Sequence, residues 1–281
     1  MRKNSLWIVM ALILIGFFVW ITGYGSSGEP GGSQVTGSIT IAGSSSVQPF
    51  SEILAEEFMA QYTEARVNVQ GGGSSQGIEA VKSGVADIGA SSRELSPEEK
   101  TPYEYLIAKD GIVIVVHPSN PINDLSLEQV ADIFTSRISN WKEVGGHDAD
   151  ITLVSREAGS GTREGFETLA LDKESVSDRA LIANSTGAIR MIVADDRNAI
   201  GYISLAILDY TVKPLKINGV DPTAENILND SYPVNRPFIY ITNEEPTGLV
   251  LTFISFVLSE EGQRILHDEG VVMVNPSDDD H

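Results

Sequence analysis

One short segment of this chain combines residue types that bind anions. Residues 156–164 read Arg-Glu-Ala-Gly-Ser-Gly-Thr-Arg-Glu and stand between an apolar run and a predicted helix. N–H groups at the start of a helix point outward, the helix dipole favours negative charge there, and glycine lets the backbone approach a ligand closely. The guanidinium of Arg156 adds a permanent charge and a fork of donors. The segment therefore predicts a site for an oxyanion.

Other segments rich in serine and glycine repeat this pattern, each after a β-like run: Gly43-Ser-Ser-Ser46, Gly71-Gly-Gly-Ser-Ser75 and Ser91-Ser92-Arg93. Their hydroxyl groups could hold the same anion from other sides. The alternatives are an ordinary serine N-cap for the first segment and a flexible turn for the second. A nucleotide loop is excluded for the second segment, because Ile78 stands where a P-loop needs lysine. Arg93 could join the anion, but pairing with a surface carboxylate is favoured.

An enzyme is not favoured by the residues that catalysis would need. Gly159-Ser160-Gly161 lacks the Gly-x-Ser-x-Gly spacing of a nucleophile elbow, and none of the four histidines has a motif context. Neither a His-x3-His pattern nor an EF-hand pattern is present, and the chain has no cysteine. We expect no catalytic residue, no metal site and no cofactor. Asn184-Ser-Thr-Gly187 precedes a helical pattern, and it could close over a ligand or simply cap that helix.

The elements that must position these loops alternate between strand and helix patterns, which predicts an α/β fold with largely parallel strands. Strands are expected at 38–42, 66–70, 88–90, 111–117, 151–154, 200–204 and 237–241, with amphipathic helices between them. Two C-terminal helices follow at 248–258 and 260–269, of which the first is apolar nearly all round and expected to be buried. No linker separates two sequential domains, so we expect two lobes joined by crossing strands near residues 117 and 238.

The first 36 residues differ from the rest. Arg2 and Lys3 precede an uncharged run from Leu6 to Ile21, and a Gly/Ser-rich stretch follows. The run predicts either an uncleaved signal anchor with a flexible linker or a cleaved signal peptide, and in both cases the body lies outside the cytoplasm. The formal net charge of −20 argues against nucleic-acid binding, and it means that an anion site must be local and shielded from water.

In their order and spacing these segments resemble the phosphate-binding protein of bacterial and archaeal phosphate ABC transporters. The resemblance covers about residues 38–275, and it rests on Ala42–Phe50, Gly72–Gly77, Asp87–Leu95, Ile138–Gly146, Arg156–Glu164 and Ala199–Ser204. It implies a two-lobed type II periplasmic-binding-protein fold, with mixed sheets flanked by helices and a hinge of two crossing strands. The expected parts are the N-terminal segment 1–36, a first lobe of 37–117 plus 238–281, and a second lobe of 118–237.

The resemblance also implies a ligand, a site and partners. Inorganic phosphate would bind in the cleft between the lobes, to Ser45, Ser46, Ser74, Ser92, Arg156, Ser160, Gly161 and Thr162. The partners would be the membrane permease subunits of a phosphate ABC transporter, and the receptor is expected to be a monomer held at the outer face of the cell membrane by its N-terminal segment. Ser92 stands where one branch of the family has an aspartate, so a receptor for sulfate, molybdate or tungstate is the alternative. The family's usual lipid-attachment cysteine is missing.

Overall fold

The computed structural model describes residues 35–101 and 103–273. The predicted anchor or signal sequence lies outside these residues, as does the acidic C-terminal tail. Among the described residues, no helix has the length and apolar character needed to span a bilayer.

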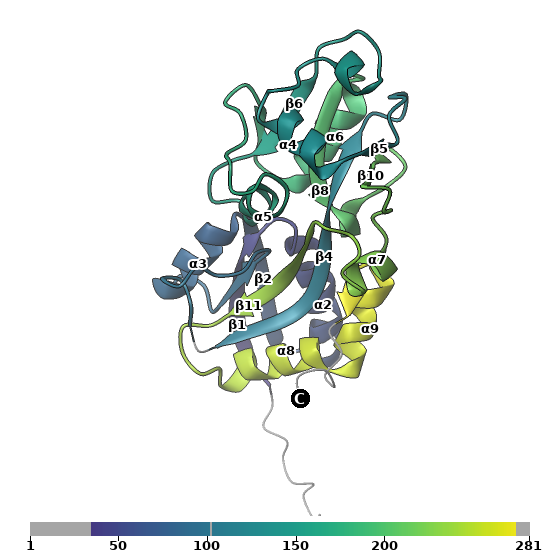
Figure 1. The fold of residues 1–281 in the computed structure, drawn as a ribbon. Coiled ribbons are helices and arrows are strands. Elements are labelled where there is room, and N and C mark those ends of the chain that lie inside the picture. The colour runs from purple at the N-terminus through teal and green to yellow at the C-terminus, as the bar shows by residue number, and fades with distance from the viewer. Residues whose placement is uncertain (1–34, 102, 274–281) are drawn as a thin grey trace, which may run out of the picture. The chain divides into compact units, whose positions relative to one another are not determined.

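The body is built on one mixed sheet that runs through both lobes (Figure 1). Its strands follow the order β2-β1-β3-β11-β4-β8-β6-β7, and the pairs β1–β2, β1–β3, β6–β8 and β6–β7 are parallel. The remaining pairs along this path are antiparallel. The strands of the path are β1 (Gly37–Ser44), β2 (Ala65–Gly72), β3 (Ile88–Ser91), β4 (Glu104–Val116), β6 (Thr152–Arg156), β7 (Leu181–Ala183), β8 (Ala199–Ser204) and β11 (Asn235–Ile241).

Helices cover this sheet in both lobes. The lower lobe of Figure 1 carries α2 (Gln48–Gln61), α3 (Ser74–Lys82), α8 (Gly248–Leu258) and α9 (Glu260–Asp268). The upper lobe carries α4 (Leu127–Phe134), α5 (Gly161–Ala170) and α6 (Thr186–Asp195). Smaller elements complete the body: β5 (Asp124–Leu125), β9 (Lys213–Pro214), β10 (Lys216–Ile217), β12 (Val272–Met273), α7 (Ala224–Leu228) and the 3₁₀ turns Trp141–Val144 and Leu205–Ile207.

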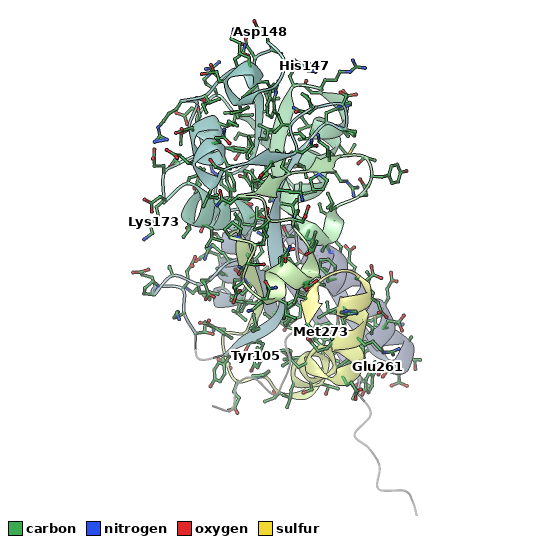
Figure 2. The ribbon with its side chains drawn as sticks, turned by 45° about the vertical axis from the view of Figure 1, so that its right-hand side comes forward. Tyr105, His147, Asp148, Lys173, Glu261 and Met273 are labelled. Atoms are coloured by element: carbon green, nitrogen blue, oxygen red, sulfur yellow. The ribbon has the colours of Figure 1, made fainter. Side chains whose placement is uncertain are left out.

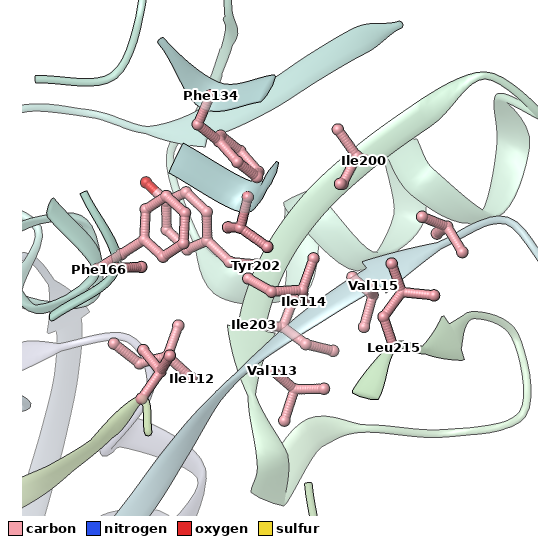
Figure 3. Close-up of a cluster of buried hydrophobic side chains, with 14 of the residues drawn as sticks. Ile112, Val113, Ile114, Val115, Phe134, Phe166, Ile200, Tyr202, Ile203 and Leu215 are labelled. Atoms are coloured by element: carbon pink, nitrogen blue, oxygen red, sulfur yellow. The ribbon is translucent and has the colours of Figure 1, made fainter. Parts of the chain in front are cut away.

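Each lobe has its own hydrophobic core, and β4 and β11 pass between the two. In β4, Ile107 and Ala108 belong to the lower core, whereas Ile112 to Val116 belong to the upper core. Along β11 the passage from the upper core to the lower core falls between Val234, just before the strand, and Phe238. The upper core packs the ring of Phe166 flat on Tyr202, 4.1 Å between centroids, with Phe134 at their edge (Figure 3). The lobe boundaries at 117 and 238 stay a prediction. The side chains of β4 pass from the lower core to the upper core several residues before 117.

The observed elements differ from the expected ones where the sequence pattern is weak. β4 begins at Glu104, whereas the sequence pattern predicted a start at Gly111. The first half of the strand, Glu-Tyr-Leu-Ile-Ala-Lys-Asp, was not predicted because it lacks the continuous apolar run of the second half. The helix 248–258 has the expected bounds, but it is buried on one side only, and Leu251 is 47% exposed. Trp141 is buried and donates its indole N–H to the carbonyl of Asn198.

Candidate anion-binding site

Four helix N-termini meet at the boundary between the lobes. In the lower lobe, Ser45 and Ser46 form the turn between β1 and α2, and Ser74 is the first residue of α3. In the upper lobe, Thr162 lies in the first turn of α5 and Thr186 is the first residue of α6. Each loop follows a strand end and precedes a helix, so the sheet delivers all four helix starts to the same boundary. Their positive dipole ends and hydroxyl groups face one small region.

The centre of this region is a buried group of hydroxyls bonded across the boundary. Ser46 Oγ lies 2.9 Å from both Thr162 Oγ1 and Thr186 Oγ1, and Arg156 Nη1 donates to Thr186 Oγ1 at 3.0 Å. All four side chains are at most 1% exposed. We call Ser46, Thr162, Thr186 and Arg156 the inner contact. Because hydroxyls can rotate, an entering oxyanion could exchange these neutral bonds for charge-assisted ones, which are about twice as strong.

A second set of hydroxyls extends the donor surface into the lower lobe. Ser44 Oγ donates to Ser92 Oγ at 2.8 Å, and Ser74 Oγ lies 3.5 Å from Ser92 Oγ while it accepts a bond from Ser92 N. Ser44 Oγ in turn accepts from Ser46 N. Ser92 Oγ thus accepts from Ser44, and its own hydrogen can point either to Ser74 or to a ligand, so Ser92 can extend the donor set.

Arg156 carries the positive charge of the inner contact. It ends β6, is 1% exposed, and forms two bonds with Glu157, Nε–Oε2 at 2.8 Å and Nη2–Oε1 at 2.7 Å. Glu157 thus orients the guanidinium and leaves Nη1 for the site. Arg163 pairs with Glu167 and donates to the Arg156 carbonyl at 3.1 Å. Tyr202 Oη accepts from Arg156 N, and burial raises the pKa of Tyr202 to about 12, so it stays neutral.

Glycine is required where the two lobes touch. A Cβ on Gly161 would collide with the Ser74 hydroxyl and come within 2.8 Å of Ser92 Oγ. A Cβ on Gly73 would come within 2.5 Å of the Gly159 carbonyl, which accepts a bond from Ser75 N at 3.2 Å. Glycine therefore allows the backbones of the two lobes to meet as closely as they do.

Charged residues form a separate contact at the rim. Arg93 makes two bonds with Glu99, at 2.7 and 2.8 Å, and its Nε lies 2.5 Å from Glu164 of α5 across the boundary. Ser75 bridges Arg93 and Glu164. We call Arg93, Glu99, Glu164 and Ser75 the outer contact. Arg93 thus pairs with carboxylates, as the sequence favoured, although it is only 9% exposed. The outer contact borders a cavity of about 1080 Å³ that residues of both lobes line.

The charges of the outer contact affect one another. The hydrogen bond from Arg93 is the main reason that the pKa of Glu99 falls to about 2. Burial raises the pKa of Glu164, the attraction of Arg93 only partly offsets this effect, and repulsion from Glu99 adds to it. Burial opposes the charge of Arg93, but the bond to Glu99 and the attraction of Glu164 and Glu99 together outweigh this effect, and the pKa of Arg93 is raised. Glu164 is therefore the group whose charge is least favourable where it lies.

A buried ion pair lies directly behind Ser92. Arg236 on β11 donates from Nε and Nη2 to Asp110 Oδ2, at 3.0 and 2.8 Å, and from Nη1 to the carbonyl of Ser92 at 3.2 Å. Asp110 on β4 also accepts from Ser204 Oγ at 2.8 Å. Burial raises the pKa of Asp110 and lowers that of Arg236, so each charge depends on the other.

The structure brings together the residues that the sequence singles out: Ser45, Ser46, Ser74, Ser92, Arg156, Ser160, Gly161 and Thr162. Ser160 differs from the others because its hydroxyl accepts from Arg163 N and caps α5, so its role toward a ligand stays a prediction. Sequence reasoning missed Thr186, Asp110 and Arg236. The segment 184–187 was the one signal for Thr186: Ser185 caps α6, and the next residue faces the site.

Neither His147 nor a group of metal-binding side chains lies at the inner contact in the described part of the chain. His147 lies at the tip of the upper lobe, away from the crossing strands (Figure 2). Among residues 35–101 and 103–273, no three His, Cys, Asp or Glu side chains are grouped so that they could hold a metal ion. The groups that line the inner contact are neutral hydroxyls, helix N-termini and one oriented guanidinium. Such a set can hold a small oxyanion by its oxygens.

Comparisons with known proteins agree with this geometry. Residues 28–261 match the model of the PBP superfamily domain. The chain is 35% identical to the phosphate-binding protein PstS of Bacillus subtilis, over 98% of this chain and 95% of that protein. It is 43% identical, with a TM-score of 0.83, to a phosphate ABC transporter substrate-binding protein from Clostridium perfringens whose crystal structure holds phosphate, covering 85% of this chain and all of the other. An ABC-type phosphate transport receptor from Vibrio cholerae is 37% identical with a TM-score of 0.73, covering 84% and 100%.

Proposed function

The chain belongs to the PBP superfamily and, within it, to the phosphate-binding proteins of phosphate ABC transporters, and from this membership we propose that it captures inorganic phosphate between its lobes and delivers it to such a transporter. The observation that carries the proposal is the inner contact. Hydroxyls from both lobes and the guanidinium of Arg156 meet at a point that is at most 1% exposed. The relatives named above are all phosphate-binding or phosphate-transport proteins. Sulfate, molybdate and tungstate are therefore used only as competitors in the binding test.

Phosphate would bind by closing the lobes. Ser45, Ser46, Ser74 and Ser92 belong to the lower lobe, whereas Arg156, Gly161, Thr162 and Thr186 belong to the upper one. An oxyanion gains all of these contacts only when the lobes meet, so it stabilises the closed state. Closure also removes water, which strengthens each bond to the charged ligand. Because Glu157 neutralises much of the charge of Arg156, the helix N-termini supply much of the remaining attraction.

The same membership supports a proposal about where the receptor acts and which proteins it contacts. We propose that the body acts outside the cytoplasm, as a monomer, and that the apolar run Leu6–Ile21 keeps it at the outer face of the membrane in place of a lipid. The permease subunits of the transporter would receive the phosphate when the lobes open. The protein would bind phosphate without transforming it, and it would need no metal or cofactor.

Calorimetric titration of the anion-stripped full chain, purified in a mild detergent, tests the proposal. We expect phosphate to bind one-to-one, and an equal concentration of sulfate, molybdate or tungstate not to displace it. Absence of heat with phosphate, or tighter binding of another oxyanion, would refute phosphate capture and leave the fold unaffected. Turnover of a phosphate ester by the same sample would refute a purely binding role.

A further inference from the structure

The ion pair between Asp110 and Arg236 occupies a special place in the fold. The two residues are direct neighbours across β4 and β11, at the level where both strands pass from one core to the other. Their side chains are at most 1% exposed. They therefore lie at the crossing of the two strands that join the lobes, and directly behind the site.

Stability alone gives little reason for a buried pair at this place. Removing two charges from water costs several kcal/mol per ion, and apolar residues of similar volume often stabilise a fold equally well. The geometry indicates a more specific role. Both Nε and Nη2 of Arg236 are bonded to one oxygen of Asp110, and this fixes the plane of the guanidinium so that Nη1 points at the Ser92 carbonyl.

Ser92 needs such support because β3 ends at Ser91, where it still pairs with Ile239 of β11. One residue beyond the ladder, Ser92 is held by Arg236 through its carbonyl and by Ser74 through its N–H. Its side chain then joins Ser44 to Ser74. The orientation of the Ser92 peptide thus sets the positions of the lower-lobe hydroxyls.

The same pair also reaches the upper lobe. The second oxygen of Asp110 accepts from Ser204, the last residue of β8, and the Arg236 side chain lies 3.9 Å from where a Cβ on Gly165 of α5 would stand. A chain of bonds therefore runs from the Ser92 loop through both crossing strands to the upper sheet. It aligns the lower half of the site with the lobe that carries Arg156.

We infer that Arg236, oriented by Asp110, is a positioning residue for anion binding: it holds the Ser92 peptide at the crossing of the two strands, and so aligns the lower-lobe donors with the upper lobe. The inference rests on the proposed phosphate function. It concerns residues outside the donor set, since Arg236 contacts the site only through a backbone carbonyl. A bond from a charged donor contributes roughly 1.5–3 kcal/mol, so its loss corresponds to about tenfold to hundredfold in affinity.

The test compares Arg236→Lys with Tyr240→Phe in the full chain in detergent. Lysine keeps the charge beside Asp110, but it lacks the fork that holds Ser92 as well. Tyr240→Phe is the matched control, because Tyr240 lies on the same strand as Arg236 and the change removes its buried 2.6 Å bond to Ser51 of α2 without altering a residue of the site. Phosphate Kd and the unfolding temperature are measured for both variants and for the wild type. We expect Arg236→Lys to weaken phosphate binding about tenfold or more, and Tyr240→Phe to lower the unfolding temperature with Kd unchanged.

The outcomes separate this inference from the function on which it rests. A change in Kd below threefold for Arg236→Lys overturns the inference. If that variant does not fold, the double variant Asp110→Leu/Arg236→Met decides: folded protein with Kd weakened threefold or more supports positioning, whereas wild-type affinity or failure to fold assigns the pair to stability alone. If the wild type binds sulfate but not phosphate, the proposed function fails and the same comparison is made with sulfate. If the wild type binds neither, both fail.

Discussion

The lobes meet at an inner contact and at an outer contact, and the two differ in their chemistry. The inner contact consists of neutral hydroxyls and one guanidinium that Glu157 already orients. The outer contact consists of three charged side chains, in which Arg93 is shared by Glu99 and Glu164, and of the bridging hydroxyl of Ser75. An anion can enter the first because hydroxyls can turn to donate, whereas the charged side chains of the second are already paired with one another. We therefore expect the ligand to bind at the inner contact, and the outer contact to affect only how readily the lobes close.

Removal of Arg156 should disrupt the inner contact and cause the largest loss of phosphate affinity. Arg156→Ala takes away the charge that donates to Thr186, and it leaves the Glu157 carboxylate beside the site without its partner. We expect phosphate affinity to fall by roughly 3–5 kcal/mol, which is two to nearly four decades. Calorimetric titration measures the loss, and Arg137→Ala is the control because Arg137 is a half-exposed arginine paired with Glu174. A loss below one decade would refute the assignment of Arg156.

Substitution of Gly161 should prevent the lobes from meeting while it removes no donor group from the site. In Gly161→Ala the new Cβ would collide with Ser74 from the opposite lobe. Overpacking of this kind costs roughly 1–3 kcal/mol, so we expect phosphate binding to weaken about tenfold to hundredfold. Gly187→Ala is the control at another helix start, since its Cβ would have its nearest neighbour 3.9 Å away. Small-angle scattering with saturating phosphate should show incomplete closure for Gly161→Ala alone, and equal affinities of the two variants would contradict the argument.

The adjacent residues Ser185 and Thr186 allow helix capping to be separated from ligand binding, because their hydroxyls have different partners. Ser185 accepts from Ala188 N as the cap of α6, whereas Thr186 bonds to Ser46 and Arg156. Thr186→Val should weaken phosphate binding about threefold to tenfold at nearly unchanged unfolding temperature. Ser185→Ala should lower the unfolding temperature, since a lost cap costs about 1 kcal/mol, with little change in Kd. The reverse pattern would show that the two roles are exchanged.

These residues also show what a sequence can and cannot predict. The Gly/Ser loops were predictable, because each stands between a β-like run and a helical pattern, and sheet topology brings such helix starts together. Ser185 and Thr186 were not separable, because either hydroxyl could cap the helix until the backbone angles are known. Asp110 and Arg236 are 126 positions apart and belong to no motif. Only the register of β4 against β11, which the weak pattern of residues 104–110 concealed, places them together.

The smallest effect is expected at the outer contact, and its sign depends on pH. The groups that act on the Glu164 charge are Arg93, Glu99 and Glu167, and the bond from Ser75 does not prevent burial from raising the pKa of Glu164. A raised pKa in the closed state means that closure is favoured while Glu164 is protonated, and that this advantage is lost as the pH rises through the raised pKa. Glu164→Gln should therefore bind phosphate somewhat more tightly than the wild type at neutral pH, by less than about threefold because Glu164 is partly exposed.

The ratio of the two dissociation constants is the quantity to measure, because the ionisation of phosphate itself affects both proteins equally. Titrations between pH 4 and pH 8 should give a ratio near one at the acidic end, where both side chains are neutral, and a growing advantage for Glu164→Gln above it. Weaker binding by Glu164→Gln at neutral pH would show that the Arg93–Glu164 pair holds the lobes together. The outer contact would then stabilise the closed state directly. The proposed distinction between an inner contact that binds the ligand and an outer contact that only affects closure would no longer hold.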